Sequence, residues 1–147
     1  MEEKSIRVKR LGADVELPRR ETAGSAGFDL RAHIQEPLAV EPGGCVMVPT
    51  GLAVELPTGF AGMMFSRSGL GAKHGLVVAQ GVGVIDSDYR GEVLVPLRNL
   101  GQKPYTLQPG ERMAQMILLP VCLPQVQEAE ELSPTRRGEG GFGSTGK

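Results

Sequence analysis

The chain has 147 residues and a mass of 15.6 kDa, which is the size of one ordinary domain. Its 16 basic and 17 acidic residues nearly cancel, so it lacks the basic excess expected of a nucleic-acid-binding domain. Glycine (21 residues) and proline (11 residues) are abundant, and only 4% of the residues are aromatic. Because both residues are unfavourable inside helices, these counts argue against a helical bundle.

Targeting and redox signals are absent from the sequence. The N-terminal residues contain no apolar segment of the signal-peptide kind, and the apolar-rich stretch at 113–123 is interrupted by Gln115 and Pro120. Cys45 and Cys122 lie far apart and form neither a disulfide framework nor a zinc motif. We therefore expect a cytoplasmic protein with free thiols that binds neither membrane nor nucleic acid.

Turns and short apolar runs alternate along the chain. Turn signals with proline or glycine occur at residues 41–44, 49–51, 57–59 and 108–110. Strand-like runs occur at residues 46–48, 52–56, 76–79, 91–97 and 113–119. This spacing predicts an all-β fold, either a sandwich or a barrel. One short helix is expected at residues 68–74, with Ser68 at its N-cap.

The composition changes near residue 128. This change predicts a β domain at residues 1–127 and a flexible C-terminal arm at residues 128–147. The last ten residues include five glycines and have little to bury. The arm also contains Arg137, so its successive glycine amides beside an arginine suggest a wrapper for an anion that becomes ordered on binding.

Residues 65–69 form a second candidate anion site. Arg67 and Ser68 stand at the predicted start of the helix, where backbone donors, a hydroxyl and a guanidinium can meet one anion. The alternative is an ordinary helix cap beside a solvated arginine.

Residues 81–91 resemble a hairpin. Gly81 and Gly83 would let the backbone approach a ligand closely, and Asp86 follows two β-branched residues, which makes it a candidate general base. The alternative is a turn that uses aspartate and glycine for its geometry alone.

Five segments in order resemble the five motifs of the trimeric dUTPase (dUTP diphosphatase) family. They are residues 26–32, 67–71, 83–91, 110–116 and 137–146. The resemblance implies a distorted jelly-roll-like β-barrel or sandwich with one short helix and a flexible C-terminal arm. It also implies a homotrimer with shared active sites and hydrolysis of dUTP to dUMP and pyrophosphate. That reaction would supply dUMP for thymidylate synthesis and keep uracil out of DNA.

The resemblance also implies a role for each motif residue. Asp86 would activate the attacking water, and Tyr89 would exclude a ribose 2′-hydroxyl. Mg²⁺ would arrive on the substrate triphosphate without a direct protein ligand, held through water by Asp29. The other expected substrate contacts are Arg67, Ser68, Gly69, Gln80, Gly83, Val84, Ile85, Gln115, Arg137, Phe142, Ser144 and Thr145. Gln80 stands where bacterial members commonly have asparagine.

Two other functions are weighed on the same fold. A dCTP deaminase, or a bifunctional deaminase–dUTPase, would need a catalytic glutamate in the core. The strand carboxylates Glu55 and Glu92 are better interpreted as residues of a solvated face. A non-catalytic nucleotide-binding protein would be expected to lose Asp86 or the arm motif, and both are present.

Overall fold

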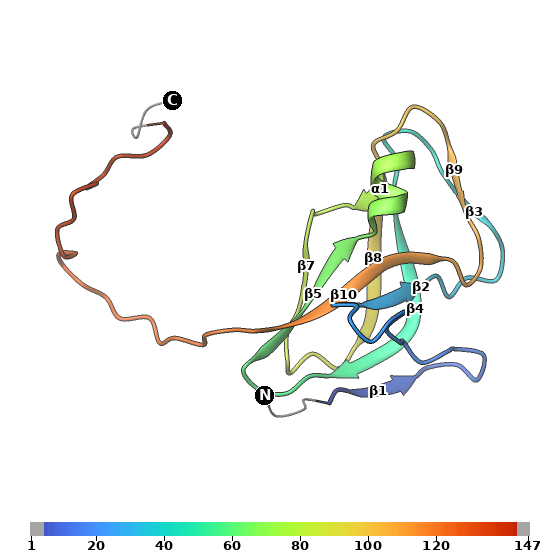
Figure 1. Cartoon of the computed structure of the whole chain (residues 1–147), viewed down its shortest axis with the longest axis horizontal. Helices are drawn as coiled ribbons and strands as arrows, with labels where there is room; N and C mark the ends of the chain where they lie inside the picture. Colours follow the sequence, from blue (N-terminus) through green and yellow to red (C-terminus); the bar gives the residue numbers. More distant parts are fainter. Residues whose placement is uncertain (1–4, 144–147) are drawn as a thin grey trace.

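A computed structural model of the chain describes residues 5–143. Within this range the chain forms short and medium-length strands and one short helix (Figure 1). The strands are β1 (Arg7–Arg10), β2 (Phe28–Arg31), β3 (Leu38–Val40), β4 (Cys45–Glu55), β5 (Phe60–Ser66), β6 (Leu76–Val78), β7 (Gly83–Ile85), β8 (Glu92–Asn99), β9 (Tyr105–Leu107) and β10 (Arg112–Pro120). The helix is α1 (Ser68–His74).

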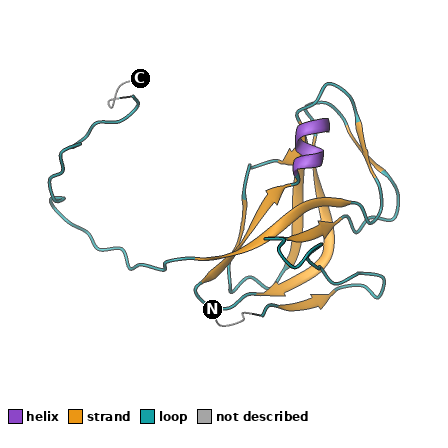
Figure 2. Ribbon diagram, viewed as in Figure 1, coloured by secondary structure: helices purple, strands orange, loops and turns teal. Residues whose placement is uncertain are grey.

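The strands form two four-stranded sheets and a two-stranded ladder (Figure 2). One sheet has the order β1-β4-β8-β6, the other has the order β2-β10-β5-β7, and β3 pairs with β9. Every pairing is antiparallel. The predicted all-β fold with one short helix, jelly-roll-like in its architecture, is confirmed.

The core consists of aliphatic and methionine side chains, as the low aromatic content requires. Strand β8 shows the pattern most clearly, because Val93, Val95 and Leu97 are buried and alternate with exposed or half-buried neighbours. Met113 and Met116 of β10 contribute from the other sheet. Buried Asn99 donates to the carbonyls of Val40 and Lys103, both at 2.8 Å, so its amide ties the end of β8 to two loops.

The predicted turn at residues 49–51 is instead a bulge within the long strand β4. Pro49 lies opposite Leu94, and the next pair is Ala53 opposite Glu92. Between these two pairs β4 therefore contains more residues than β8, which defines the bulge. Gly51 has φ of +68° there, and its N–H donates to Glu92 Oε1 at 2.8 Å. The prediction was wrong because the proline-glycine signal marks a bend without saying whether pairing resumes beyond it.

The predicted hairpin at residues 81–91 is also wrong. Strand β7 pairs with β5 in one sheet, whereas β8 pairs with β4 and β6 in the other. The segment between them crosses from one sheet to the other. As a result, Asp86 and Tyr89 stand in a connection between two sheets rather than at a hairpin tip.

Helix α1 has the predicted residues but a different cap. Arg67 is the N-cap residue, with extended backbone angles and no side-chain capping hydrogen bond, and Ser68 is the first helical residue. Gly75 ends the helix in the left-handed region at φ of +70°, where its N–H donates to Gly71. The Ser68 hydroxyl is therefore not the cap that the sequence predicted.

The C-terminal residues leave the body as an extended arm (Figure 1). Among the described residues, the last backbone hydrogen bond to the body runs from Val121 N to Gly59 O at 2.8 Å. The division between a β domain at residues 1–127 and an arm at residues 128–147 stays a prediction. Within residues 5–143 there is no helix long and apolar enough to cross a membrane.

Candidate active site

A first pocket lies where the edge strand β7 faces the start of β8. It has a volume of about 290 Å³. Its lining includes six of the predicted site residues, which are Gln80, Gly83, Val84, Ile85, Asp86 and Tyr89. Met47 of β4, Met64 of β5 and Glu92 of β8 complete much of the wall. The pocket thus combines apolar side chains with two acidic residues, Asp86 and Glu92.

The backbone of β7 can serve as a recognition edge. This strand is the last in its sheet, with β5 on one side and, among residues 5–143, no strand on the other. Gly83 is buried, and a Cβ there would lie 3.1 Å from Met64 Cβ, so glycine permits close packing on β5. Gly81 has φ of +81° and open space around it, so backbone geometry accounts for that glycine.

Asp86 and Tyr89 belong to one tight turn after β7. Tyr89 N–H donates to the Asp86 carbonyl at 3.2 Å, and the Tyr89 hydroxyl donates to the Glu92 carbonyl at 2.9 Å. The Asp86 side chain is exposed beside the pocket, where it can reach a ligand. Tyr89 is 45% exposed, so the ring stands as a wall of the pocket.

A second pocket, of about 310 Å³, contains five more of the predicted site residues. Asp29, Arg67, Ser68, Gly69 and Gln115 all line it, together with Glu21, Ser25, Ala26 and Gly27. Gln115 of β10 is paired with Asp29 of β2, and its amide donates to Ser66 O at 3.1 Å. A Cβ on Gly69 would meet no heavy atom within 4 Å, so the protein leaves open space there.

An ion-pair network holds the second pocket together. Asp29 lies 3.0 Å from Arg67 Nε and 3.3 Å from Arg112, and Arg112 also pairs with Glu21 at 3.1 Å. The Asp29 side chain is only 14% exposed. Because Asp29 holds the Nε edge of Arg67, it fixes the direction of that guanidinium beside Ser68.

These two pockets do not combine within one chain. Ile85 pairs with Gly62 on β5, and Arg67 follows Gly62 by five residues (67 − 62 = 5). At roughly 3.3 Å per residue of strand, Arg67 lies about 16 Å along the sheet from the β7 end that carries Asp86. Asp86 and Arg67 of the same chain therefore cannot contact the same phosphate group.

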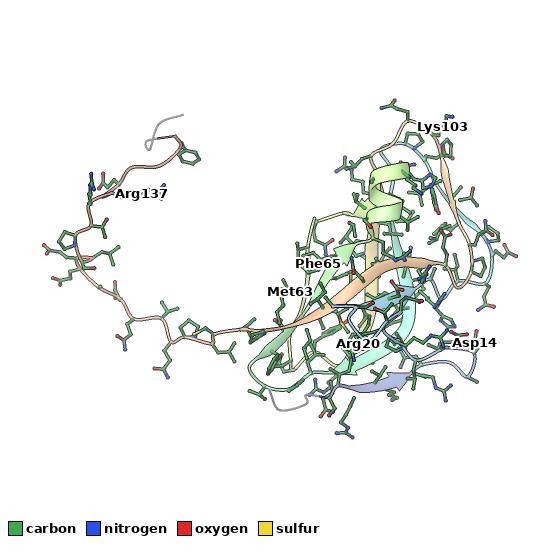
Figure 3. The ribbon with its side chains drawn as sticks, in the orientation of Figure 1. Asp14, Arg20, Met63, Phe65, Lys103 and Arg137 are labelled. Carbon is green, nitrogen blue, oxygen red and sulfur yellow. The ribbon has the colours of Figure 1, made fainter. Side chains whose placement is uncertain are left out.

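The arm residues form a third group that touches neither pocket. Figure 3 shows Arg137 far from the body that carries Met63 and Phe65. Arg137 Nε donates to Gly140 O at 2.7 Å, which is a local turn, and Phe142 is fully exposed. The predicted contacts Ser144 and Thr145 lie outside the described residues.

The residues present fit a magnesium ion that arrives with its ligand. No group of three or more His, Cys, Asp or Glu side chains suited to a metal ion occurs in residues 5–143. Asp29 was predicted to hold Mg²⁺ through water, and both of its carboxylate oxygens face arginines. Mg²⁺ commonly keeps several waters and binds through substrate phosphates, which this donor set allows.

Three residues of the site were missed or misjudged from the sequence. Glu92 was expected on a solvated face, but it is half-buried and its carboxylate accepts the Gly51 N–H. Arg112 and Glu21 were given no role, although both join the network around Asp29. The only signal for Arg112 was its place beside Gln115 in the fourth motif, because its partners are distant in sequence.

The fold and the site define a small all-β protein whose strand-edge pocket carries a carboxylate and whose second pocket carries an arginine, a serine and a glutamine. The dUTPase family model matches residues 13–146, and the chain belongs to this family. The family and the enzyme class predicted from the five motifs, dUTP diphosphatase, are thereby confirmed.

Individual relatives agree with this assignment. The chain is 50% identical to deoxyuridine 5′-triphosphate nucleotidohydrolase of Alcanivorax borkumensis over 139 residues, which cover 94% of this chain and 93% of that protein. It is 50% identical to the Desulfitobacterium hafniense protein of the same name over 147 residues, with 97% of both chains covered. A solved structure of Staphylococcus bacteriophage 80alpha dUTPase with dUpNHpp has a TM-score of 0.87 at 29% identity, covering 97% of this chain and 99% of that one.

Proposed function

We propose that this cytoplasmic protein hydrolyses dUTP to dUMP and pyrophosphate, with Asp86 activating the water that attacks the α-phosphorus. The observation that carries the proposal is the division of the site into two chemically distinct pockets. One has a free strand edge, an aromatic wall and Asp86, and the other has Arg67, Ser68 and Gln115. Relatives of this chain are named for this activity, and the phage 80alpha enzyme was solved with dUpNHpp.

Asp86 would act as the general base. Its exposed carboxylate stands at the end of β7, where a bound water can lie between it and the first phosphate of a nucleotide seated along the strand. The backbone of residues 83–85 would read uracil by an N–H to O4 and a C=O to N3–H. Cytosine would oppose a donor to that N–H and leave the C=O without a proton, and each mismatch costs about 1–3 kcal/mol. Gln80 lines the same pocket and would add a contact to the base.

The second pocket would bind the phosphates. Arg67 supplies charge, and Ser68 supplies a hydroxyl. Gly69 leaves space for an oxygen atom to approach, and Gln115 supplies an amide. Such preorganised donors stabilise the charge that develops in phosphoryl transfer. Arg137 of the arm would neutralise the terminal phosphate, Phe142 would stack on the uracil, and Ser144 and Thr145 would add hydroxyl contacts.

Mg²⁺, when bound with the triphosphate, would neutralise phosphate charge and orient its oxygens. Asp29 would hold waters of that ion from the phosphate side. In the chain itself, Asp29 also directs Arg67, so one carboxylate serves both tasks.

The separation of the pockets supports a homotrimer with shared active sites. Because one chain keeps Asp86 and Arg67 about 16 Å or more apart along the sheet, a complete site would take its β7 side from one protomer and its Arg67 side from another. The arm extends away from the body of its own chain, so it would close over a site of the assembly. In this arrangement the site would be complete only in the assembly.

A substrate panel tests this function directly. Pyrophosphate release should be rapid from dUTP with Mg²⁺ and nearly absent from dCTP, dTTP and UTP. Ammonia release from dCTP would instead support the deaminase. That activity would need a catalytic glutamate in the core, and Glu92, the glutamate that lines the base pocket, has its carboxylate engaged by Gly51 N–H. Tight dUTP binding without pyrophosphate release would support the non-catalytic alternative.

A further inference from the structure

We propose that Gly91 is a positioning residue for sugar specificity, because the absence of a side chain there determines where the Tyr89 ring stands. The inference rests on the proposed function, since Tyr89 is the wall that would exclude a ribose 2′-hydroxyl. It adds to that function the reason why the wall is held in place. The observation is a steric one and concerns two residues of the same connection.

The Tyr89 ring lies directly on the backbone of Gly91. A Cβ built on Gly91 would lie 2.3 Å from the Tyr89 hydroxyl oxygen, 2.6 Å from Cζ and 2.9 Å from Cε2. Real Cβ atoms essentially never come within 3.0 Å of such neighbours. The ring in this position and a side chain at residue 91 exclude each other.

Backbone geometry gives no other reason for a glycine here. Gly91 is not among the glycines with positive φ, unlike Gly81, which precedes β7. An alanine could therefore adopt the Gly91 backbone conformation without the strain of the left-handed region. The contact with Tyr89 is what reserves this position for glycine.

The other anchor of the ring is a rigid one. The Tyr89 hydroxyl donates to the carbonyl of Glu92, whose carboxylate is bound by Gly51 N–H and whose backbone pairs with Ala53. The next residue, Val93, accepts the Thr50 hydroxyl at 2.7 Å. Tyr89 is thus held between the Gly91 backbone and the Glu92 carbonyl. Glu92 is itself attached to β4 through its carboxylate and through its backbone pairing.

Moving the Tyr89 ring should weaken the discrimination between deoxyribose and ribose. A methyl group at residue 91 requires the hydroxyl oxygen to retreat from 2.3 Å to ordinary contact at 3.4 Å or more, a shift of at least 1.1 Å (3.4 − 2.3 = 1.1). That shift also stretches the 2.9 Å hydrogen bond to Glu92. Since a misplaced steric contact is worth roughly 10- to 200-fold in discrimination, we expect the dUTP-to-UTP ratio of kcat/KM to fall about tenfold or more.

The test is a double-mutant cycle with Gly91→Ala, Tyr89→Ala and the combined variant, assayed with dUTP and UTP. Gly91→Ala should lower the dUTP-to-UTP ratio about tenfold in the wild-type background. It should leave the ratio unchanged in the Tyr89→Ala background, because no ring remains to be displaced. The matched control is Gly24→Ala, since Gly24 is exposed, lacks positive φ and has no heavy atom within 4 Å of the place that a Cβ would occupy. It should leave the ratio unchanged.

Thermal unfolding gives a readout that does not depend on activity. If Gly91→Ala lowers Tm or prevents folding, removing the ring by Tyr89→Ala should restore the fold of the combined variant. An unchanged substrate ratio in Gly91→Ala would overturn the proposal. So would an equal effect of Gly91→Ala with and without the ring. If the wild-type protein does not hydrolyse dUTP, the proposed function is refuted. The recovery of Tm on adding Tyr89→Ala to Gly91→Ala would still test the contact between Tyr89 and Gly91.

Discussion

Arg67 Nε lies 3.0 Å from the Asp29 carboxylate, which joins the N-cap of α1 to strand β2. The side chains are 27% and 14% exposed, so the pair is more protected from solvent than a surface salt bridge. Arg112 shares the same carboxylate at 3.3 Å. The Asp29 carboxylate therefore offsets the charge of two guanidinium groups at the place where the phosphates would bind.

We expect Asp29→Asn to damage both stability and activity. Loss of the carboxylate leaves Arg67 and Arg112 facing each other, and should reduce the free energy of unfolding by about 1–3 kcal/mol and kcat/KM at least tenfold. Urea unfolding and dUTP kinetics measure the two effects. Glu55→Gln is the matched control, because its pair with Arg7 is exposed and should contribute less than about 1 kcal/mol. Equal effects of the two variants would contradict this view of Asp29.

Two inactive variants should restore activity when mixed. Asp86→Asn should lower turnover about 10²- to 10⁴-fold while still binding dUpNHpp, and Arg67→Ala should lose phosphate binding. If a site takes Asp86 and Arg67 from different protomers, unfolding and refolding the two variants together should create some sites with both residues intact. Refolding each variant alone is the control. Mixed protein as inactive as its parents would rule out sharing of these residues.

Removal of residues 137–147 should separate folding from catalysis. The last described backbone hydrogen bond from the C-terminal segment to the body is at Val121, so the body loses no described backbone contact to it. We expect an unchanged Tm and far-UV circular dichroism spectrum, with dUTP turnover strongly reduced because Arg137 and Phe142 are lost. Arg137→Ala and Phe142→Ala in the full chain would show which of the two accounts for the loss. Full activity of the truncated protein would remove the arm from the site.

Tyr105 should make the fold sensitive to alkaline pH. Burial raises its pKa to about 12, with a further contribution from its hydrogen bond to Glu111. Because the unfolded chain releases this proton near pH 10 and the folded chain holds it to about 12, stability should fall as the pH rises from about 10 to 12. The chain has two tyrosines and no tryptophan, so the absorbance of a Tyr89→Phe variant reports Tyr105 alone. Titration near pH 10 in that folded variant would contradict the expectation.

Local sequence was sufficient for residues that act as neighbours in the chain. Arg67 and Ser68 are neighbours at the start of α1, so their place in the chain predicted that they lie together, whereas Gly69 and Tyr89 were expected only from the resemblance to the family. The helix was predicted with its correct residues, and the five motifs indicated the family.

Pairing between distant strands could not be predicted from these patterns. The turn signal at residues 49–51 became a bulge because β8 continues to pair with β4 on both sides of it. The segment at residues 81–91 is not a hairpin because β7 pairs with β5, so the residues after β7 cross to the other sheet. Glu92, judged from alternation to be solvated, is engaged because the bulge turns the Gly51 N–H toward it.

Composition and residues close in the chain were enough to predict the fold class, the aliphatic core and the chemical groups of the site. Where those groups lie relative to one another depends on strand pairing. Antiparallel pairing of β2 and β5 with β10 brings Asp29, Arg67 and Gln115 into one pocket, while β7 carries Asp86 to another about 16 Å or more away. The reason is geometric, since strand register sets distances that no local pattern records.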